Sequence, residues 1–310
     1  MRLWVTGASG FVGSNLVAVF AERHGAEVVA PRHAEVDVAD AAAVRDAVAA
    51  ARPDAIVHAA IWNAFADLER DRPRAWAAYV GATRNVVDAA NAGGIPVVLI
   101  STDWVFDGTQ GPAAEDAPPS PVNAYGFLKA ASELVVTERA DRGIVARIAA
   151  VQGVHRARPS APRAQDAGFG YFVAALVDTL RAGRRFTVWD GPGLNALATP
   201  TLATDAGELI WRALERDVTG ILHCCGGEHA DRVGLARRAV AAFGLDPDLL
   251  DVGAPPPEAL PARVPRDTRL DATATAALLG VELPDLDTQL ARLRDELDVA
   301  HPASPETITA

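Results

Sequence analysis

The chain has 310 residues, half of them hydrophobic, and carries 29 basic and 40 acidic side chains for a formal net charge of -11. This length predicts one large domain or two interlocked ones with a sizeable core. A surface this acidic repels phosphate backbones, so the charge argues against nucleic acid as a partner. It still permits a nucleotide in one pocket, where local backbone donors outweigh the overall charge.

Targeting and redox signals place the protein in the cytoplasm. The first residues, MRLWVTGASG, lack the pattern of a secretory signal, and no apolar run reaches membrane-spanning length. Cys224 and Cys225 are adjacent, which disfavours an ordinary structural disulfide and favours two buried thiols in a reducing compartment. The seven histidines show no metal-ligand spacing. We therefore expect a cytoplasmic protein with no membrane partner and no bound metal.

Short apolar runs alternate with helical patterns through the first half of the chain. The strands are predicted at residues 2–7, 26–31, 54–60, 95–102 and 143–151. The helices between them are predicted at residues 14–25, 40–53, 74–94 and 123–140. Repeated strand–helix units of this length predict an α/β fold, a Rossmann-type doubly wound parallel sheet with helices on both faces.

After about residue 150 the pattern loosens. Helices are predicted at residues 171–183, 204–217, 231–246 and 283–298, strands at 184–190 and 220–227, and loops at 155–168 and 254–267. Thr204 is a candidate N-cap of its helix. We expect a Rossmann domain over 1–150, to which later segments return, a smaller α+β substrate-binding lobe over 151–300, and a loose tail over 301–310.

The first predicted strand runs into a glycine loop, TGASGFVGSNL, before a helix. We expect Gly7 to allow the tight turn, Gly10 to let a pyrophosphate approach the backbone, and Gly13 to let the helix pack closely. The free N–H groups of the helix N-terminus favour the same phosphates. The loop therefore predicts a dinucleotide cofactor. The residues expected to contact it here are Gly7, Ser9, Gly10, Phe11, Val12 and Gly13.

The end of the second strand indicates which dinucleotide binds. An Asp or Glu at that point would bind the adenosine ribose of NAD, but the sequence reads VVAPRHAEVD and places Arg32 and His33 there. Arg32 suits a 2′-phosphate, so the pattern favours NADP (NADPH) over NAD and makes 1–150 an NADP-binding domain. The alternative is that Arg32 is only a solvated loop charge. Asp37 and Val38 would then face the adenine.

Tyr125 and Lys129 are spaced i, i+4 in a predicted helix, so both project from one face. A nearby ammonium lowers the pKa of a phenol from its usual value of about 10, which suits proton transfer near neutral pH. One strand earlier, Ser101 and Thr102 place hydroxyls where parallel sheets bind ligands. Alone, the tyrosine and lysine would indicate an ordinary surface helix. With the glycine loop and these hydroxyls in one chain, they predict an active site.

The segments TGASGFVG, VHAA, STDWVFDG and YGFLK together resemble the extended short-chain dehydrogenase/reductase family. STDWVFDG is similar to the motif of dTDP-4-dehydrorhamnose reductases, the 4-ketoreductases of nucleotide-sugar synthesis, and PRDTRLDATATAALLG resembles their C-terminal region. The resemblance covers nearly the whole chain and is strongest over residues 1–150. It implies an oxidoreductase in which NADPH delivers hydride to the ketone of a nucleotide-linked deoxysugar or a related small molecule, and it is compatible with a homodimer.

The resemblance also implies roles for particular residues. Tyr125 would protonate the developing alkoxide, Lys129 would bind the nicotinamide ribose and lower the tyrosine pKa, and Thr102 would hold the carbonyl oxygen. Two pairs would line the ligands, with Ala59 and Ala60 at the cofactor and Asp103 and Trp104 at the substrate.

Three departures from the family pattern keep alternatives open. Tyr79 stands at the position of a usual asparagine, and Ala150 and Gln152 stand where aromatic residues usually surround the sugar. No arginine clamp for a substrate pyrophosphate is evident. Its candidates are Arg156, Arg158, Arg163, Arg184 and Arg185. One alternative is an epimerase, or a reductase of a non-nucleotide substrate, on the same fold. The other is a catalytically idle NADP-binding regulatory subunit.

Overall fold

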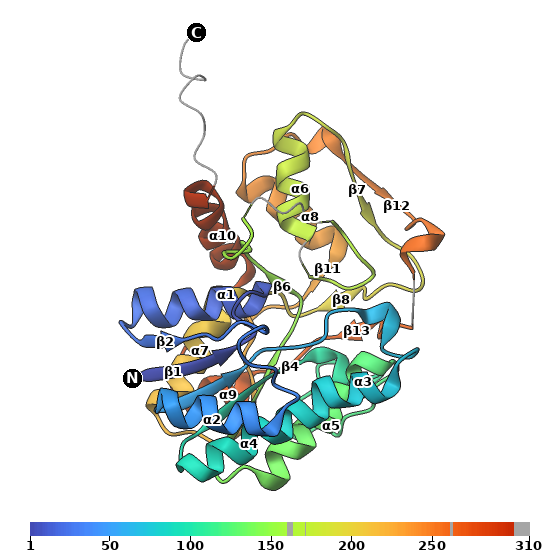
Figure 1. Cartoon of the computed structure of the whole chain (residues 1–310). Helices are drawn as coiled ribbons and strands as arrows, with labels where there is room; N and C mark the ends of the chain where they lie inside the picture. Colours follow the sequence, from blue (N-terminus) through green and yellow to red (C-terminus); the bar gives the residue numbers. More distant parts are fainter. Residues whose placement is uncertain (160–163, 171, 261–262, 301–310) are drawn as a thin grey trace.

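A six-stranded parallel sheet forms the centre of the molecule, for which a computed structural model describes residues 1–159, 164–170, 172–260 and 263–300. Its strands run in the order β10–β5–β4–β3–β1–β2 (Figure 1). Their bounds are β1 Arg2–Thr6, β2 Glu27–Val29, β3 Ala55–His58, β4 Val97–Thr102, β5 Gly143–Ile148 and β10 Gly220–His223. The strand order reverses between β1 and β3, which confirms the predicted doubly wound sheet and puts a ligand crevice at their carboxyl ends.

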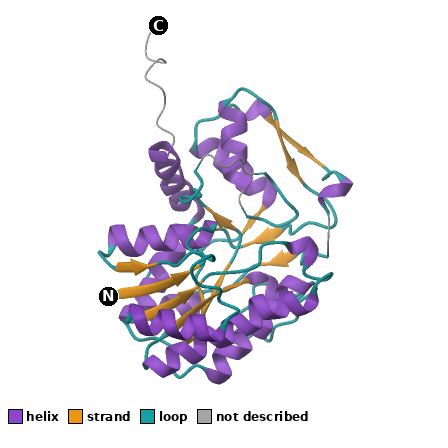
Figure 2. Cartoon of the chain, viewed as in Figure 1, coloured by secondary structure: helices purple, strands orange, loops and turns teal. Residues whose placement is uncertain are grey.

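Helices cover both faces of the sheet, and Figures 1 and 2 show the two layers. One layer contains α1 (Phe11–Ala18), the π-helical turn η1 (Val19–Arg23) and α7 (Ala203–Glu215). The other contains α2 (Ala41–Ala51), α4 (Ala82–Gly93) and α5 (Ala124–Arg139). The predicted helix at 74–94 is broken into α3 (Arg72–Trp76), the π-helical turn η3 (Ala77–Gly81) and α4.

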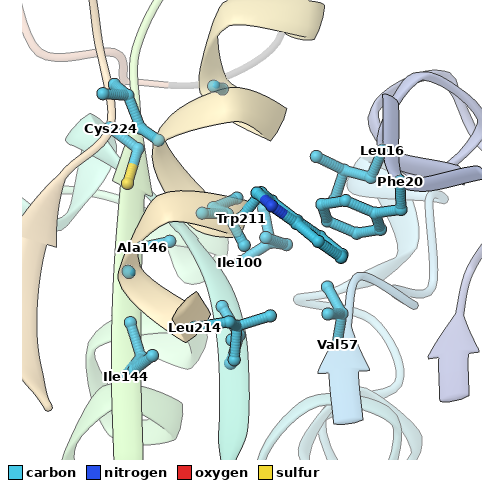
Figure 3. Close-up of a cluster of buried hydrophobic side chains, with 14 of the residues drawn as sticks. Leu16, Phe20, Val57, Ile100, Ile144, Ala146, Trp211, Leu214 and Cys224 are labelled. Carbon is cyan, nitrogen blue, oxygen red and sulfur yellow. The ribbon is translucent and has the colours of Figure 1, made fainter. Parts of the chain in front are cut away.

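Apolar residues on each helix layer meet the sheet at the spacing that the sequence predicted. On the α1 and α7 layer, Leu16, Phe20 and Trp211 pack with Val57 and Ile100 of the sheet (Figure 3). On the opposite layer, the buried valines of α2 and α4 pack against the other faces of β1, β3 and β4. Burial of apolar area in these two layers is the main stabilising term for such a sheet.

The second half of the chain contributes to this sheet as well as to a separate lobe. Strand β10 pairs with β5, placing Gly220 opposite Ile144, and α7 covers the adjoining face. The strand prediction for 220–227 is confirmed for its first half. Cys224 and Cys225 follow it as buried free thiols, in agreement with the sequence prediction.

The lobe is built from α6 (Phe172–Arg181), α8 (Arg232–Ala242) and α10 (Leu286–Ala300), whose apolar faces share one core. Its short pairings join β8 (Leu197–Ala198) to β11 (Ala230–Asp231) and β13 (Asp267–Thr268), β7 (Phe186–Trp189) to β12 (Leu250–Gly253), and β6 (Val151–Gln152) to β9 (Thr201–Leu202). The remaining elements are η2 (Phe65–Asp67), η4 (Asp103–Val105), η5 (Pro247–Leu249), η6 (Pro257–Ala259) and α9 (Thr273–Leu279).

Two further points concern the chain as a whole. The loose tail predicted over residues 301–310 lies outside the described residues. Within the described ranges, every helix is too short or too polar to cross a bilayer.

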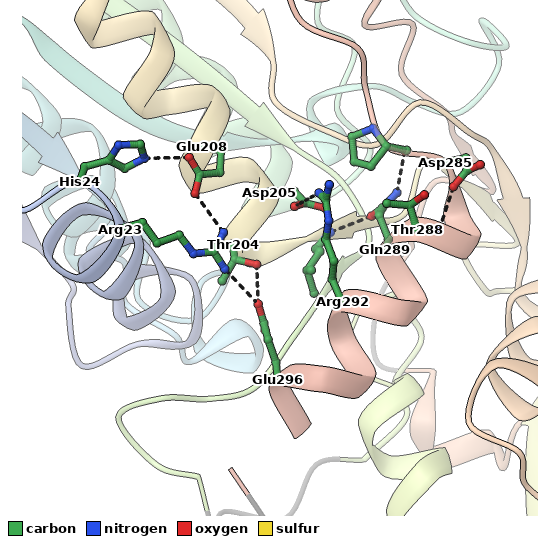
Figure 4. A network of polar contacts seen from close by, with 12 residues as sticks. Arg23, His24, Thr204, Asp205, Glu208, Asp285, Thr288, Gln289, Arg292 and Glu296 are labelled. Carbon is green, nitrogen blue, oxygen red and sulfur yellow. Dashed lines mark hydrogen bonds and ion pairs between the residues drawn. The ribbon is translucent and has the colours of Figure 1, made fainter. Parts of the chain in front are cut away.

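Thr204 does not cap α7, contrary to the sequence prediction. The N-cap position is Leu202, whose side chain makes no capping bond, and Thr204 lies inside the first turn. The Thr204 hydroxyl instead donates to Glu296 Oε1 on α10, at 2.6 Å. An ion pair between Asp205 and Arg292 joins the same two helices (Figure 4). The residue that looked like a local cap therefore fastens α10 onto the Rossmann domain.

A buried ion pair joins α5 to the sheet. The Arg147 guanidinium on β5 lies 2.8 Å from the Glu133 carboxylate on α5, and their side chains are 0% and 3% exposed. Ser101 also donates its hydroxyl to Glu133. This contradicts the prediction that Ser101 offers its hydroxyl to a ligand. Ser101 and Thr102 both line one cavity, but the Ser101 hydroxyl proton is donated to Glu133.

We expect loss of this pair to be costly. Arg147→Met leaves the Glu133 carboxylate buried and unpaired, and should lower the free energy of unfolding by about 3–5 kcal/mol in urea titrations. The matched control is Arg139→Met on α5, the helix that carries Glu133. It removes the pair with Asp88, where both side chains are about half exposed, and should cost less than about 1 kcal/mol. Equal losses in the two variants would contradict this account.

Candidate active site

The glycine loop makes two close backbone approaches that only glycine permits. Gly7 has φ of +71°, and a Cβ on it would lie 2.6 Å from the Ala59 carbonyl. A Cβ on Gly13 would lie 2.2 Å from the Gly7 carbonyl oxygen. Gly13 therefore lets α1 pack onto the loop itself. The loop, the start of α1 and the end of β3 are thereby held together at the switch point of the sheet.

The end of β3 is fixed to the end of β1 by a polar contact. Thr6 Oγ1 lies 2.8 Å from His58 Nδ1 and accepts a hydrogen bond from the Ala60 N–H at 3.2 Å. Burial, with a smaller contribution from the charge of Lys129, lowers the pKa of His58 to about 3. A neutral imidazole thus supports the segment that was predicted to line the cofactor.

One cavity of about 1870 Å³ begins at the glycine loop and runs to α5 and the lobe. It is lined by every residue that the sequence proposed for catalysis, for the cofactor and, apart from the clamp arginines, for the substrate. These are Gly7, Ser9, Gly10, Phe11, Val12, Gly13, Arg32, Asp37, Val38, Ala59, Ala60, Thr102, Asp103, Trp104, Tyr125 and Lys129. The far wall comes from the lobe, through residues that include Asp166, Asn195 and Arg263. Its length and its glycine cradle fit a dinucleotide followed by a second ligand.

Helix α5 carries Tyr125 and Lys129 in its first two turns. It begins after Asn123, whose side-chain oxygen accepts a hydrogen bond from the Gly126 N–H at 2.9 Å. A Cβ on Gly126 would lie 2.1 Å from the Trp104 carbonyl oxygen. The helix therefore starts directly against η4, and this packing sets Tyr125 beside the residues that follow β4.

Lys129 is buried beside the tyrosine. Its side-chain Nζ donates to the Ile100 carbonyl oxygen at 2.7 Å and lies 5.8 Å from the centre of the Tyr79 ring. Burial lowers the pKa of Lys129 to about 8, and the charge of Glu133 opposes part of this fall. The ammonium form still predominates at neutral pH, so a positive charge is held at this end of the cavity.

Three aromatic rings surround Tyr125. Phe65, Trp104 and Tyr79 meet it edge to face, with ring centroids 5.0, 6.0 and 6.3 Å away. Phe65 is half exposed and lines the cavity, whereas Tyr79 is buried and donates its hydroxyl to the Trp62 carbonyl at 3.1 Å. Tyr79 thus occupies the usual asparagine position as a packing residue within η3. Phe65 was missed because a single loop aromatic carries no sequence signal.

Hydrogen bonds join the residues after β4 that the sequence predicted to contact the substrate. The Thr102 hydroxyl donates to Asp103 Oδ1 at 3.0 Å and accepts from the Trp104 N–H at 3.2 Å. Thr102 and Asp103 are 6% and 4% exposed, so both lie at the floor of the cavity. The Trp104 ring reaches across to the lobe, where a Cβ on Gly168 would lie 3.2 Å from it.

Arg32 lines the cavity, and its side chain is paired with Glu35. Its guanidinium makes two hydrogen bonds to Glu35 Oε1, at 2.7 and 3.1 Å, and its side chain is 78% exposed. The i, i+3 spacing of Arg32 and Glu35 is the sequence signal of this pair. A 2′-phosphate in this position would have to compete with the Glu35 carboxylate.

The structure also places the other residues at which this sequence departs from the family pattern. Gln152 is buried and donates to the Ala150 and Phe169 carbonyl oxygens, while Ala150 lines the cavity. Among the proposed clamp arginines, Arg158 lines the cavity, Arg156 donates to Asn15, and Arg185 pairs with Asp251. Arg184 is exposed, and Arg163 lies outside the described residues. Arg263 lines the cavity but escaped sequence analysis because it sits in a proline-rich loop without periodicity.

Comparison with known proteins identifies the class. A dTDP-4-dehydrorhamnose reductase of Bacillus anthracis, solved in complex with NADP, superposes with a TM-score of 0.79 at 21% identity, covering 95% of this chain and 99% of that one. This likeness shows the fold. Together with sequence relatives that are named as reductases of dTDP-linked ketosugars, it shows that the chain is an NAD(P)-dependent oxidoreductase of the extended short-chain dehydrogenase/reductase class.

Sequence relatives identify the family. A dTDP-4-keto-6-deoxy-D-glucose reductase of Streptomyces niveus is 31% identical over 248 residues, 79% of this chain and 80% of the relative. A dTDP-4-dehydrorhamnose reductase of Burkholderia thailandensis is 30% identical over 296 residues, 92% and 95% of the two chains. The Methionine adenosyltransferase 2 subunit beta of Xenopus tropicalis is 27% identical over 256 residues, 79% and 72% of the two chains. The RmlD substrate binding domain family matches residues 1–299, and the chain belongs to it. The resemblance predicted from the sequence is confirmed.

The close approach at Gly13 gives a direct test of the cradle. Gly13→Ala should displace α1 from the loop, because the new methyl would overlap the Gly7 carbonyl, and should weaken NADPH binding at least tenfold in a fluorescence titration. Gly25→Ala is the matched control. Gly25 has positive φ, unlike Gly13, and a Cβ there meets open space, so the substitution should lower stability slightly and leave cofactor affinity unchanged. Equal affinities in the two variants would contradict the assigned cradle.

Proposed function

We propose that this protein is an NADPH-dependent reductase of the 4-keto group of a dTDP-linked deoxysugar. The observation that carries the proposal is the single cavity that joins the glycine loop to Thr102, Tyr125 and Lys129. The names of the Streptomyces and Burkholderia relatives support the substrate class. The acidic surface does not oppose it, because Arg158 and Arg263 line the cavity and suit a diphosphate.

The described residues fit the cofactor along its whole length. The loop from Gly7 to Gly13 would hold the pyrophosphate, Arg32 the 2′-phosphate, Asp37 and Val38 the adenine end. Asn85 braces the adenine segment by donating to the Val38 and Ala39 carbonyls, each at 3.1 Å. Ala59, Ala60 and Lys129 would border the nicotinamide ribose. When bound, NADPH supplies the hydride.

The residues of this chain would then handle the substrate oxygen. Tyr125 would donate its phenolic proton to the oxygen as negative charge develops there. The buried Lys129 ammonium favours the phenolate that remains. Thr102, at the floor of the cavity, would donate a second hydrogen bond to the same oxygen. The rings of Phe65 and Trp104 cover Tyr125 and limit the access of water to it.

Removal of the phenol separates an enzyme from a regulatory cofactor binder. Tyr125→Phe should lower kcat for dTDP-4-keto-6-deoxy-D-glucose at least 100-fold and leave the Kd of NADPH within about twofold. Both would be measured by NADPH fluorescence and absorbance. Phe127→Tyr, which places a phenol on the exposed side of the same helix, is the control and should not restore turnover when combined with Tyr125→Phe.

Three other outcomes would speak against the proposal. Full turnover in Tyr125→Phe would remove Tyr125 from the chemistry. Tight NADPH binding without turnover in the unaltered protein would favour a regulatory subunit. Interconversion of sugars without net oxidation of NADPH would favour an epimerase.

The preference for NADPH over NADH can be tested through the ion pair between Arg32 and Glu35. Arg32→Ala should weaken NADPH binding and leave NADH binding unchanged, since only NADPH carries the 2′-phosphate. Glu35→Gln should act in the opposite direction and tighten NADPH binding severalfold, because it frees the guanidinium from its carboxylate partner. The measurement is a paired NADPH and NADH titration of both variants. Parallel changes for the two cofactors would show that Arg32 does not read the phosphate.

A further inference from the structure

A single proton limits what Thr102 can do. A hydroxyl has one O–H to donate, and the Thr102 hydroxyl donates it to Asp103 Oδ1 at 3.0 Å. Its lone pairs accept the Trp104 N–H at 3.2 Å. In this arrangement Thr102 can accept from a ligand but cannot donate to one. A ketone oxygen that gathers negative charge needs a donor, so the hydrogen bond between Thr102 and Asp103 must change direction for Thr102 to assist.

The surroundings of Asp103 are suited to such a change. It is 4% exposed and it lines the cavity. Its second oxygen, Oδ2, makes no hydrogen bond of normal geometry within the described residues, and the neighbouring Thr268 hydroxyl stabilises the carboxylate only in part. A buried carboxylate with an unsatisfied oxygen is costly, and protonation removes that cost. Burial raises the pKa of Asp103 to about 6, and the Thr268 and Thr102 hydroxyls oppose part of the rise. Both protonation states are therefore accessible in the working range.

We propose that Asp103 is a positioning residue that sets the direction of the Thr102 hydroxyl bond. As a neutral acid, Asp103 donates to Thr102 Oγ1, and Thr102 gives its own proton to the substrate ketone oxygen. As a carboxylate, Asp103 keeps the Thr102 proton, and the ketone oxygen is left with Tyr125 alone. This inference rests on the proposed reductase function and replaces direct substrate contact as the role of Asp103.

Other titrating groups near this end of the cavity respond in different pH ranges. Burial raises the pKa of the Cys225 thiol, which faces Asp103 from the turn after β10, well above its usual value. The pKa of Lys129 on α5 is about 8, and that of His58 on β3 is about 3. Thr268 on β13 and Asn195, which donates to it at 2.8 Å, carry no charge. Burial also raises the pKa of Asp166 on the opposite wall of the cavity, with the charge of Arg232 opposing part of the rise. A change in rate near pH 6 is therefore assigned to Asp103 only where Asp103→Asn abolishes it.

The experiment is a pH profile of kcat/KM between pH 5 and 7, below the pKa of about 8 of Lys129, with NADPH and dTDP-4-keto-6-deoxy-D-glucose. The unaltered enzyme should be fastest below pH 6. As pH rises, Asp103 ionises, and the rate should fall toward a plateau up to about 100-fold lower, the cost of one lost donor to the oxyanion. Asp103→Asn should be flat at the upper level, because an amide NH₂ donates to Thr102 at every pH. Thr102→Val should be flat at the lower level.

The double variant decides whether Asp103 acts through Thr102. The rates of Asp103→Asn with Thr102→Val should equal those of Thr102→Val alone, since without the hydroxyl there is nothing to orient. Thr102→Ser should restore the pH-dependent fall. A fall near pH 6 that persists in Asp103→Asn, or effects of the two substitutions that simply multiply, would overturn the proposal.

An NMR titration of the Asp103 carboxyl tests this inference without catalysis, so its outcome does not depend on the proposed reductase activity. With ¹³C-labelled aspartate, the unaltered protein should show a carboxyl that titrates near pH 6 and is missing from Asp103→Asn. Thr102→Val should move that titration to higher pH, because it removes a donor to the carboxylate. An unmoved titration would overturn the hydrogen bond on which the inference depends. Normal titrations with no reduction of any ketosugar would instead refute the reductase.

Discussion

The burial of the Lys129 ammonium constrains the rest of the site. A charge removed from water needs fixed partners, and it finds them in the Ile100 carbonyl, the Tyr79 ring and, one helical turn away, Glu133. These contacts fix the rotation of α5 against β4. Tyr125, four residues earlier on the same helix face, therefore has to point into the cavity. The direction of the Tyr125 phenol therefore follows from the contacts that the buried Lys129 ammonium requires.

The lobe completes the cavity through one buried arginine. Arg232 at the start of α8 is 2% exposed, donates to the Gly168 and Asp166 carbonyls, and lies 5.3 Å from the centre of the Phe172 ring. It thereby fixes the loop that faces Trp104 across the cavity. Burial lowers the pKa of Arg232 to about 10, and the charge of Asp166 opposes part of the fall. The Arg232 guanidinium thus supports one wall of the cavity from inside the lobe.

The sequence was sufficient where local geometry decides the structure. The glycine spacing, the strand periodicity and the i, i+4 relation of Tyr125 to Lys129 all act within a few residues, so the first half and most of the site were predictable. Thr204 was misread because its partner, Glu296, lies 92 residues away. Two features of the site depend on tertiary packing, which residue spacing does not encode. They are the hydrogen bond from Thr102 to Asp103 and the edge-to-face contact between the Phe65 and Tyr125 rings. The two-residue strands and α9 are too short for any periodic signal.

The pairing of β10 with β5 has a consequence for folding during translation. The strand that closes the outer edge of β5 lies 76 residues further along the chain. At about 5–20 residues per second, the ribosome needs about 4–15 s to deliver it. Through that interval the nascent sheet presents an open hydrogen-bonding edge that invites pairing with other chains. The length of chain between β5 and β10, which includes α6 and α7, therefore sets how long this edge of the sheet stays unpaired and open to aggregation.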